Sequence, residues 1–325
     1  MRRRQFIAGL GAAAALPLAA GAQQALPVVG FLGALSQEQS ARQVEMFLRG
    51  LGETGFTAGR NVAIEYRFAD GRYDGLAALA SELIGRSVQV LVAQSPPAAL
   101  AAKAATTTIP IVFSVGIDPV AAGLVASFNR PGGNATGTVI NPGPVAQKRL
   151  ELIRELAPKA ADVALLVNPS IGGEAAAEVS DVRAAAQANG MELRVFHAST
   201  PGEIDAAFAA LAERRPGALL VGGDPFFMLR RQDIITHVAR SGLVAIYPFR
   251  EFTESGGLIS YGINLVNGYR QVGIYTGRIL KGARPDDLPV VQPTVLELII
   301  NLGTARVLGL EIPPLLHARS NDVIE

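Results

Sequence analysis

The sequence predicts an α/β protein of two lobes, each built on a parallel sheet that helices cover on both faces. Short apolar runs rich in β-branched residues alternate with Ala, Leu, Glu and Arg-rich segments of helical period, the pattern of doubly wound, Rossmann-like sheets. The alternation occurs in two series of similar spacing. The chain has 325 residues, of which 49% are hydrophobic and 18% charged. This composition is sufficient for two buried cores.

The two series supply the elements of the two lobes in chain order. In the first series, strands are expected at residues 28–35, 62–68, 88–94, 109–115 and 137–140, with helices at residues 39–54, 73–85, 97–105 and 119–128. In the second series, strands are expected at residues 163–167, 192–196, 218–221 and 244–247, with helices at residues 145–156, 174–189, 203–214 and 229–241. The matching order predicts two lobes of one architecture.

The C-terminal part does not extend the second series. A strand (257–263), a helix (266–280), a polar break (282–287), an apolar run (294–300) and a last helix (304–308) follow one another. A chain that returns to the first lobe and then crosses back explains this order. We therefore expect residues 27–140 and 257–287 in the N-terminal lobe, and residues 141–256 and 288–316 in the C-terminal lobe. Three crossings would form a three-strand hinge, with candidates at residues 141–144, 255–257 and 288–289.

The first 22 residues have the pattern of a twin-arginine-type signal peptide. Arg3 and Arg4 precede an apolar run over residues 6–20, which is shorter than the roughly 20 residues of a membrane span. Small residues at Ala20 and Ala22 fit cleavage after Ala22. A helix packed on the core is the alternative. Without a cysteine for lipid attachment, we expect a protein free in the periplasm.

Composition and motifs argue against several functions. The formal net charge is only +1, and three of the 29 basic residues lie in the signal, so the chain lacks the basic face of a nucleic-acid-binding protein. It has no cysteine and three well-separated histidines, which argues against a metal site. The G-K-[ST], G-x-G-x-x-G, G-x-S-x-G and H-E-x-x-H motifs are absent. We therefore predict no cofactor and no enzymatic activity.

Ligands of such sheets bind outside the carboxyl ends of the strands, so the loops that follow each strand are the candidate site. Ser95, Asp118 and Asp224 each precede a proline directly after an apolar run, and Ser36 has Gln39 at capping-box spacing. Ordinary helix capping is the alternative for each. Helix N-termini favour anions by about 0.3–1 kcal/mol each. Since micromolar affinity needs about −8 kcal/mol, apolar burial must supply most of the rest.

Aromatic and charged residues of the same loops are candidates for ligand contacts. The rings are Phe226, Tyr247, Phe249 and Tyr261, and core packing is the alternative for each of them. Asp224 would pair with a ligand ammonium. Arg250 would pair with a ligand carboxylate, unless it forms a surface ion pair. Asp118 and Asp224 would be the acid pair if the protein were an exported enzyme.

Several segments in a fixed order carry a family likeness. They are GLGETGF at 50–56, GRNV at 59–62, IPIVF at 109–113 with DPV at 118–120, PGGNATG at 131–137, LIRELAP at 152–158 with VNP at 167–169, residues 257–262, ILKG at 279–282 with Pro285, and INL at 300–302 with Ala305. In these segments the chain resembles the ABC-transporter substrate-binding proteins of the tryptophan/tyrosine type.

The resemblance implies a two-lobed receptor of the type I periplasmic binding-protein fold, without a reaction or a cofactor. Such a receptor closes over a small molecule and delivers it to an ABC permease in the inner membrane. The ligand positions that it implies are Ser36, Gln94, Ser95, Asp118, Asn168, Ser170, Asp224 and the stretch 247–249. Arg250 departs from the family pattern and favours a more anionic ligand. We expect a monomer that binds a carboxylate-bearing solute, aromatic or amino-acid-like. A sensor for a membrane receptor is the alternative, because it needs the same closure.

Overall fold

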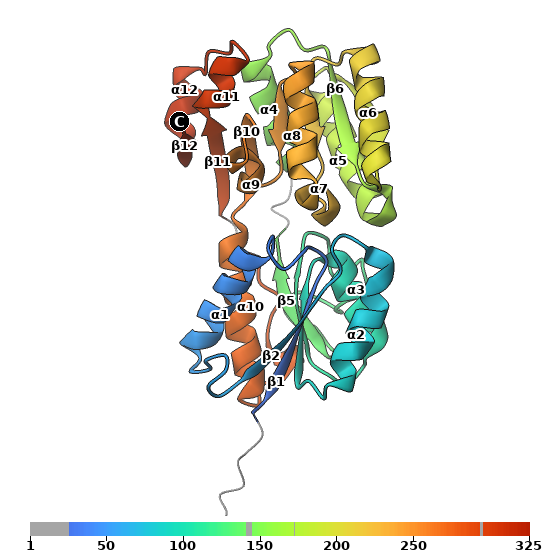
Figure 1. Ribbon diagram of the computed structural model, residues 1–325, viewed down its shortest axis with the longest axis vertical. Coiled ribbons are helices and arrows are strands. Elements are labelled where there is room, and N and C mark those ends of the chain that lie inside the picture. The colour runs from blue at the N-terminus through green and yellow to red at the C-terminus, as the bar shows by residue number, and fades with distance from the viewer. Residues whose placement is uncertain (1–25, 141–144, 172, 293–294) are drawn as a thin grey trace, which may run out of the picture.

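The structure is a computed structural model that describes residues 26–140, 145–171, 173–292 and 295–325. It contains two α/β lobes stacked along the long axis of the molecule (Figure 1). The predicted fold class is therefore confirmed. The predicted signal at residues 1–22 and the first predicted hinge segment at residues 141–144 lie outside the described residues.

Lobe one contains a parallel five-stranded sheet in the order β2-β1-β3-β4-β5. Its strands are β1 (Val28–Gly33), β2 (Ala63–Phe68), β3 (Val90–Gln94), β4 (Ile111–Val115) and β5 (Ala135–Val139). Its helices are α1 (Ala41–Glu53), α2 (Leu76–Gly85), α3 (Pro96–Ala105) and α10 (Leu265–Leu280), with the short 3₁₀ turn η1 (Tyr73–Gly75). α2 and α3 cover one face of the sheet, and α1 and α10 cover the other.

The helix expected at residues 119–128 is wrong, because this segment consists of turns. Asp118 Oδ1 accepts hydrogen bonds from the N–H groups of Val120 and Ala121, which closes a turn at the start. Gly123 has a positive φ of 71°, which is incompatible with a continuing helix.

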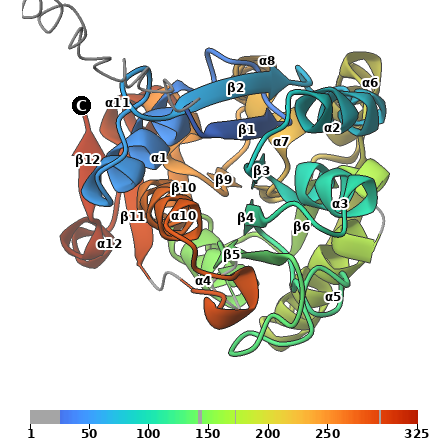
Figure 2. The same cartoon turned by 90° about the horizontal axis from the view of Figure 1, so that it is seen from below.

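Helix α10 belongs to lobe one although more than 200 residues separate it from α1. The two helices lie side by side in both views (Figures 1 and 2). Gly50 on α1 leaves no room for a Cβ, because the carbonyl of Arg270 occupies that space, and Gly273 meets the carbonyl of Phe47 in the same way. Glu53 also forms an ion pair with Arg270 at 2.6 Å. Backbone contact at these glycines fixes α10 on lobe one.

Lobe two contains a seven-stranded sheet in the order β12-β11-β10-β9-β8-β6-β7, in which only the β10–β11 pair is antiparallel. Its strands are β6 (Asp162–Val167), β7 (Glu192–His197), β8 (Leu219–Val221), β9 (Ala245–Tyr247), β10 (Ile259–Ile263), β11 (Leu296–Asn301) and β12 (Asp322–Ile324). Helices α4 (Val145–Leu156), α5 (Gly173–Ala188), α11 (Leu302–Val307) and α12 (Pro314–Arg319) pack on one face. Helices α6 (Pro201–Arg214), α7 (Pro225–Leu229), α8 (Arg231–Ser241) and α9 (Arg250–Glu254) pack on the other.

The chain crosses between the lobes at positions that differ from two of the predicted ones. β10 pairs with β9 and β11 in lobe two, so the crossing into lobe one follows Ile263 and not Gly257. The return also comes later than residues 288–289. Leu288 is fully buried in the core of lobe one, and Val139 N–H donates to the carbonyl of Val291. Strand pairing therefore keeps residues 257–263 in lobe two, and core packing keeps residues 288–289 in lobe one.

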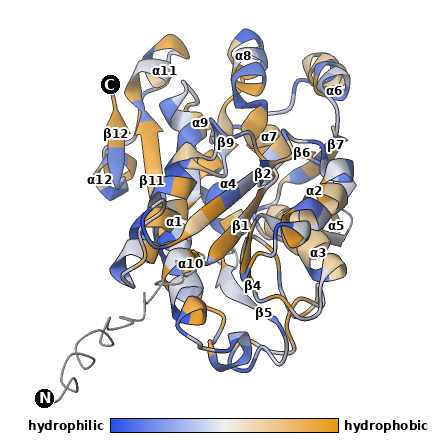
Figure 3. Ribbon diagram, turned by 60° about the horizontal axis from the view of Figure 1, so that its bottom comes forward, coloured by the Kyte–Doolittle hydropathy of each residue, from blue (hydrophilic) through white to orange (hydrophobic). Residues whose placement is uncertain are grey.

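Apolar strands form the centre of both lobes, as the colouring of β1 and β11 shows (Figure 3). Each sheet has a separate hydrophobic cluster on either face. In the described part of the chain, none of the helices has the length and hydropathy that a membrane span requires.

Candidate functional site

The lobes meet where the carboxyl ends of their strands face each other. The Tyr73 hydroxyl of lobe one donates to Asp224 Oδ1 of lobe two at 2.9 Å and accepts from the N–H of Phe226 at 2.9 Å. Gln39 Nε2 donates to the carbonyl of Leu229 at 3.1 Å. Leu35 of lobe one packs in the lobe-two cluster around α7. We call this region the lobe junction; α7 and α9 border it on lobe two (Figure 1).

Asp224 is the most strongly held carboxylate of the junction. It lies after β8 as the N-cap of α7 and is 2% exposed. Besides Tyr73, its Oδ1 accepts from Asn168 Nδ2 at 3.0 Å and from the N–H of Phe226 at 2.7 Å. Its Oδ2 is buried and accepts no hydrogen bond from the described residues. Burial raises the pKa of Asp224, and the bonds from Asn168 and Tyr73 oppose this shift. Oδ2 therefore presents an acceptor without a partner.

Arg149 and Glu178 add two charges to lobe two that the sequence analysis missed. Arg149 on α4 donates from Nε to the carbonyl of Tyr261 at 2.8 Å, and it forms no ion pair with the described residues. Glu178 on α5 accepts from the N–H of Gly223 at 3.3 Å. Burial lowers the pKa of Arg149, and nearby Glu178 opposes this shift. Burial raises the pKa of Glu178, and the nearby Arg149 opposes this shift. The guanidinium is thus held in place but retains donors for a carboxylate.

Lobe one contributes buried side chains without charge. Gln94, at the end of β3, accepts at Oε1 from the hydroxyl of Ser40 at 3.0 Å, whereas its Nε2 is buried and lacks a partner in the described part of the chain. The hydroxyls of Thr138 and Ser114 are 3.2 Å apart. Burial raises the pKa of Tyr269, and the nearby Ser114 and Gln94 oppose this shift. This cluster therefore supplies a hydrogen-bond donor, Gln94 Nε2, that has no acceptor among the described residues.

Ser95, Asn168 and Ser170 follow the strand-end prediction in position but differ in role. Ser95 caps α3, its hydroxyl accepting from the N–H of Ala98 at 3.4 Å, and it has a positive φ of 124°. Asn168 is 2% exposed and holds Asp224, while its Oδ1 accepts from the N–H of Ser170 at 3.0 Å. The Ser170 side chain is exposed. Ser95 and Asn168 therefore have structural roles at the junction, and the Ser170 side chain lies on the surface.

The four predicted rings divide between core and junction. Tyr247 is 1% exposed and stacks on Phe252 with 5.0 Å between ring centroids, and burial raises its pKa. It is a core residue. Phe226 is also buried, in the same hydrophobic cluster as Tyr247. Phe249 is partly buried, and its Cζ would lie 3.8 Å from a Cβ on Gly223, beside Asp224. Tyr261 is partly buried on β10. Phe249 is the partly buried ring that contacts the loop before Asp224 from a separate element.

Arg250, Asp118 and Ser36 have local structural roles. Arg250 forms ion pairs with Glu254 at 2.8 Å, Glu297 at 3.2 Å and Asp322 at 2.9 Å. The ion-pair alternative therefore replaces the expected pairing with a ligand carboxylate. Asp118 is exposed and closes its own turn. The Ser36 hydroxyl accepts from the N–H of Gln39 at 3.3 Å, but α1 begins only at Ala41. A strand-end position alone did not reveal where these side chains point.

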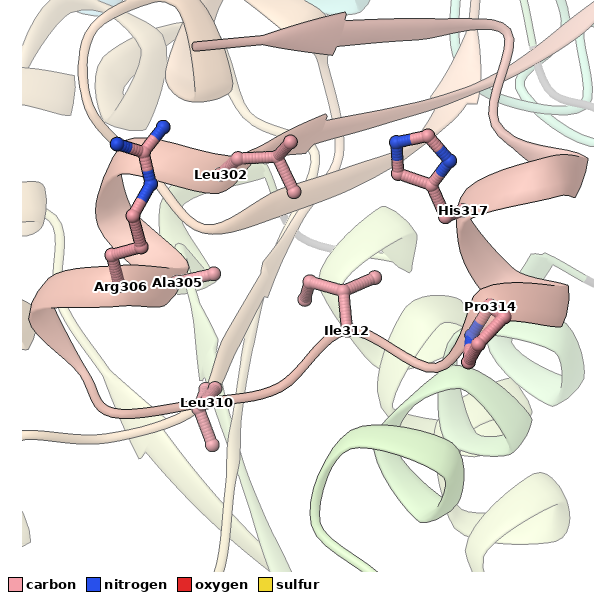
Figure 4. A pocket seen from close by; sticks show the side chains of 7 residues that line it. All are labelled: Leu302, Ala305, Arg306, Leu310, Ile312, Pro314 and His317. Carbon is pink, nitrogen blue, oxygen red and sulfur yellow. The ribbon is translucent and has the colours of Figure 1, made fainter.

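A pocket of about 460 Å³ lies elsewhere on lobe two, between α11 and α12. Leu302, Leu310 and Ile312 form its apolar part, with Arg306 and His317 at its sides (Figure 4). No residue predicted from the sequence lines it. Among the described residues, no group of His, Asp and Glu side chains has the arrangement of a metal site.

Comparisons with known proteins agree with this architecture. A curated tyrosine-binding protein from Clostridioides difficile (strain R20291) is 30% identical over 270 residues, which are 82% of this chain and 76% of that protein. The structure also matches an ABC domain in complex with L-Trp from Streptococcus pneumonia, with 25% identity, 92% and 100% of the two chains covered and a TM-score of 0.85. A conserved domain protein from Vibrio cholerae matches with 26% identity, 91% and 99% coverage and a TM-score of 0.84.

The family model described as ABC transporter substrate binding protein matches residues 28–324, which include both lobes and the crossings between them. The chain therefore belongs to the family of ABC transporter substrate binding proteins.

Proposed function

We propose that this protein is the periplasmic receptor of an ABC importer, and that it captures a small amino-acid-like ligand with an aromatic side chain between its lobes. The observation that carries this proposal is the lone acceptor Asp224 Oδ2, buried in the junction. Buried polar groups are nearly always hydrogen-bonded, so an unmatched one indicates a missing partner. The tyrosine-binding relative and the L-Trp complex support an aromatic amino acid as that partner.

The charges of lobe two suit a zwitterion. The ligand ammonium would bind Asp224 Oδ2, and the carboxylate would bind the Arg149 guanidinium. Each hydrogen bond to a charged group contributes about 1.5–3 kcal/mol. Micromolar affinity requires about −8 kcal/mol, so burial of the ligand ring against Phe249 must add to these bonds. Gln94 Nε2 offers a further donor from lobe one.

Closure of the lobes over the ligand is part of the proposal. The TM-score is 0.85 with the L-Trp complex but 0.67 with a ligand-free, open substrate binding protein from Clostridium difficile, at 25% identity and 92% coverage of this chain in both cases. Rotation of one lobe against the other lowers such a score without changing either lobe. The bonds from Tyr73 and Gln39 across the junction would break in an open form. These observations support a closed arrangement.

The remaining parts of the proposal concern location and partners. Residues 1–22 would direct export and be removed, and the mature protein would act as a free monomer. An ABC permease would receive the ligand, in keeping with the family to which the chain belongs. The exported mass of the mature chain, measured from a periplasmic fraction, tests the cleavage after Ala22.

Thermal-shift screening of the mature chain tests the ligand class. L-Tryptophan, L-tyrosine, L-phenylalanine, benzoate and indole form a panel that separates the ring, the carboxylate and the ammonium. A ligand at 100 times its Kd stabilises the protein by about 2.7 kcal/mol. We expect the aromatic amino acids to raise the melting temperature and indole to leave it unchanged. A shift with indole or a larger neutral solute, and none with any amino acid, would refute the proposed ligand class.

A further inference from the structure

Glu251 occupies an unusual place at the lobe junction. It lies in the first turn of α9, and its Oε2 is buried without a hydrogen-bond partner among the described residues. Three residues later on the same helix, Glu254 forms an ion pair with Arg42 of lobe one at 3.4 Å. α9 therefore faces the start of α1 across the junction (Figure 1). Closure places this carboxyl group against the other lobe.

The charged neighbours of Glu251 already have partners. From lobe one, Arg42 and Tyr269 lie close enough to affect its titration, and from its own helix Arg250 and Glu254 do. Arg42 is engaged with Glu254. Arg250 is engaged with Glu254, Glu297 and Asp322. Hence neither cation forms an ion pair with Glu251 in the described structure, although both stabilise its charge from a distance.

We propose that Glu251 takes up a proton when the lobes close, so that closure and ligand affinity depend on pH. This inference rests on the closure described under the proposed function. In an open form, water would solvate the carboxylate. In the closed form, Oε2 is buried without a hydrogen-bond donor among the described residues, and a poorly solvated charge is costly. Protonation removes that cost.

The direction of the pH effect follows from the shift. Burial raises the pKa of Glu251 above its ordinary 4.5. The positive charge of Arg42 opposes this rise, and the negative charge of Glu254 adds to it. The closed form thus binds more protons than the open form between the two pKa values. Closure becomes less favourable as the pH rises through that range and is constant above it. One proton changes affinity by at most about tenfold per pH unit.

Two other acidic groups must be separated from Glu251. Burial also raises the pKa values of Asp224 and Glu178, so the wild type alone does not identify the group. Glu251→Gln provides a neutral side chain of the same shape. Glu213→Gln is the control, because it removes an exposed carboxylate of α6 in the same lobe that forms no ion pair with the described residues.

Small-angle X-ray scattering without ligand gives the first measurement. At pH 8 we expect Glu251→Gln to have a smaller radius of gyration than the wild type, because it closes without burying a charge. At pH 5 the two radii are expected to converge, and Glu213→Gln is expected to lack the compaction at pH 8. Equal radii for the wild type and Glu251→Gln at pH 8 would overturn the proposal. This readout requires no ligand, so it stands even if no amino acid binds and the proposed function fails.

The second measurement is calorimetric titration with L-tryptophan at pH 6, in buffers of different ionisation enthalpy, which gives the number of protons taken up on binding. The wild type is expected to take up more protons per ligand than Glu251→Gln, by up to one, and Glu213→Gln is expected to match the wild type. Equal proton uptake in the wild type and Glu251→Gln would also overturn the proposal. If L-tryptophan does not bind, the scattering result alone decides it.

Discussion

The two lobes present different chemistry to the junction between them. Among the described buried groups, lobe one contributes neutral side chains, among them Gln94, Ser114 and Tyr269. Lobe two contributes charges: Asp224, held by three donors to one oxygen, and the partly buried Arg149 and Glu178. Charges at a buried site require built hydrogen-bond partners, and Asp224 has two of them from lobe two and a third, Tyr73, from lobe one.

This difference suggests an order of events. A zwitterionic ligand would bind first to the charged wall of lobe two, where its own charges replace water around Arg149 and Asp224. Lobe one would then close and add uncharged contacts, which cost less to desolvate. Substitutions in lobe two should therefore change affinity more than substitutions in lobe one.

The largest effect is expected for Asp224→Asn. Removing one partner of a buried charge pair typically costs about 2–5 kcal/mol, so the Kd for L-tryptophan should rise by at least about 30-fold. Calorimetric titration measures it. Asp118→Asn is the matched control, because this exposed aspartate serves only its own turn. Similar affinities for the wild type and Asp224→Asn would place the ligand ammonium elsewhere.

Arg149→Gln is expected to have the next largest effect. Loss of a charged hydrogen bond to the ligand carboxylate costs about 1.5–3 kcal/mol. Binding of L-tryptophanamide, which lacks that carboxylate, should change much less than binding of L-tryptophan. Arg250→Gln removes an arginine with three acidic partners and should affect melting temperature rather than affinity. If both arginine variants weaken binding equally, Arg149 has no special role.

Phe249→Ala should weaken binding by about 1–2 kcal/mol if its ring covers the ligand. Tyr247→Ala provides the contrast, since Tyr247 is a core residue. Truncation of a large core ring typically destabilises a protein by about 3–5 kcal/mol. Thermal melting followed by ligand titration separates the two effects. A Phe249→Ala protein with wild-type affinity would return this ring to a packing role.

Gln94→Ala, in lobe one, is expected to have the smallest effect. A neutral hydrogen bond contributes about 1 kcal/mol, so the Kd should rise about fivefold. Association and dissociation rates, measured by stopped-flow fluorescence of a labelled ligand, would show the change mainly in dissociation, because lobe one closes last. A loss larger than that of Asp224→Asn would reverse the proposed order of the lobes.

The sequence predicted most strands correctly because their period and composition are set by burial on both faces. It misplaced two crossings, since β10 and Leu288 are assigned by pairing and packing with distant segments. The helix expected at residues 119–128 failed because Asp118 and Gly123 favour turns.

The site was predicted in part. The position of Asp224 followed from the rule that ligands bind at strand ends, whereas Gln94 and Asn168 were implied by the family resemblance alone. Ligand contact at all three residues stays a prediction. Arg149 and Glu178 come from helices, and the sequence pattern did not show that their faces turn to the junction. A charged residue next to a predicted crossing, as Arg149 is, was the signal available. For Arg250 the sequence left two roles open, and the structure shows the ion-pair alternative, because its three acidic partners lie on α9, β11 and β12, which the fold brings together.

The proposed binding mode requires the junction to hold both charges of an amino acid. Calorimetric titration of the mature wild-type protein with L-tryptophan, 3-indolepropionate and tryptamine tests it most directly, because the analogues lack the ammonium or the carboxylate. Each leaves Asp224 or Arg149 without a partner, so we predict that L-tryptophan binds at least about 30-fold more tightly than either. Equal affinity for L-tryptophan and 3-indolepropionate would contradict the account.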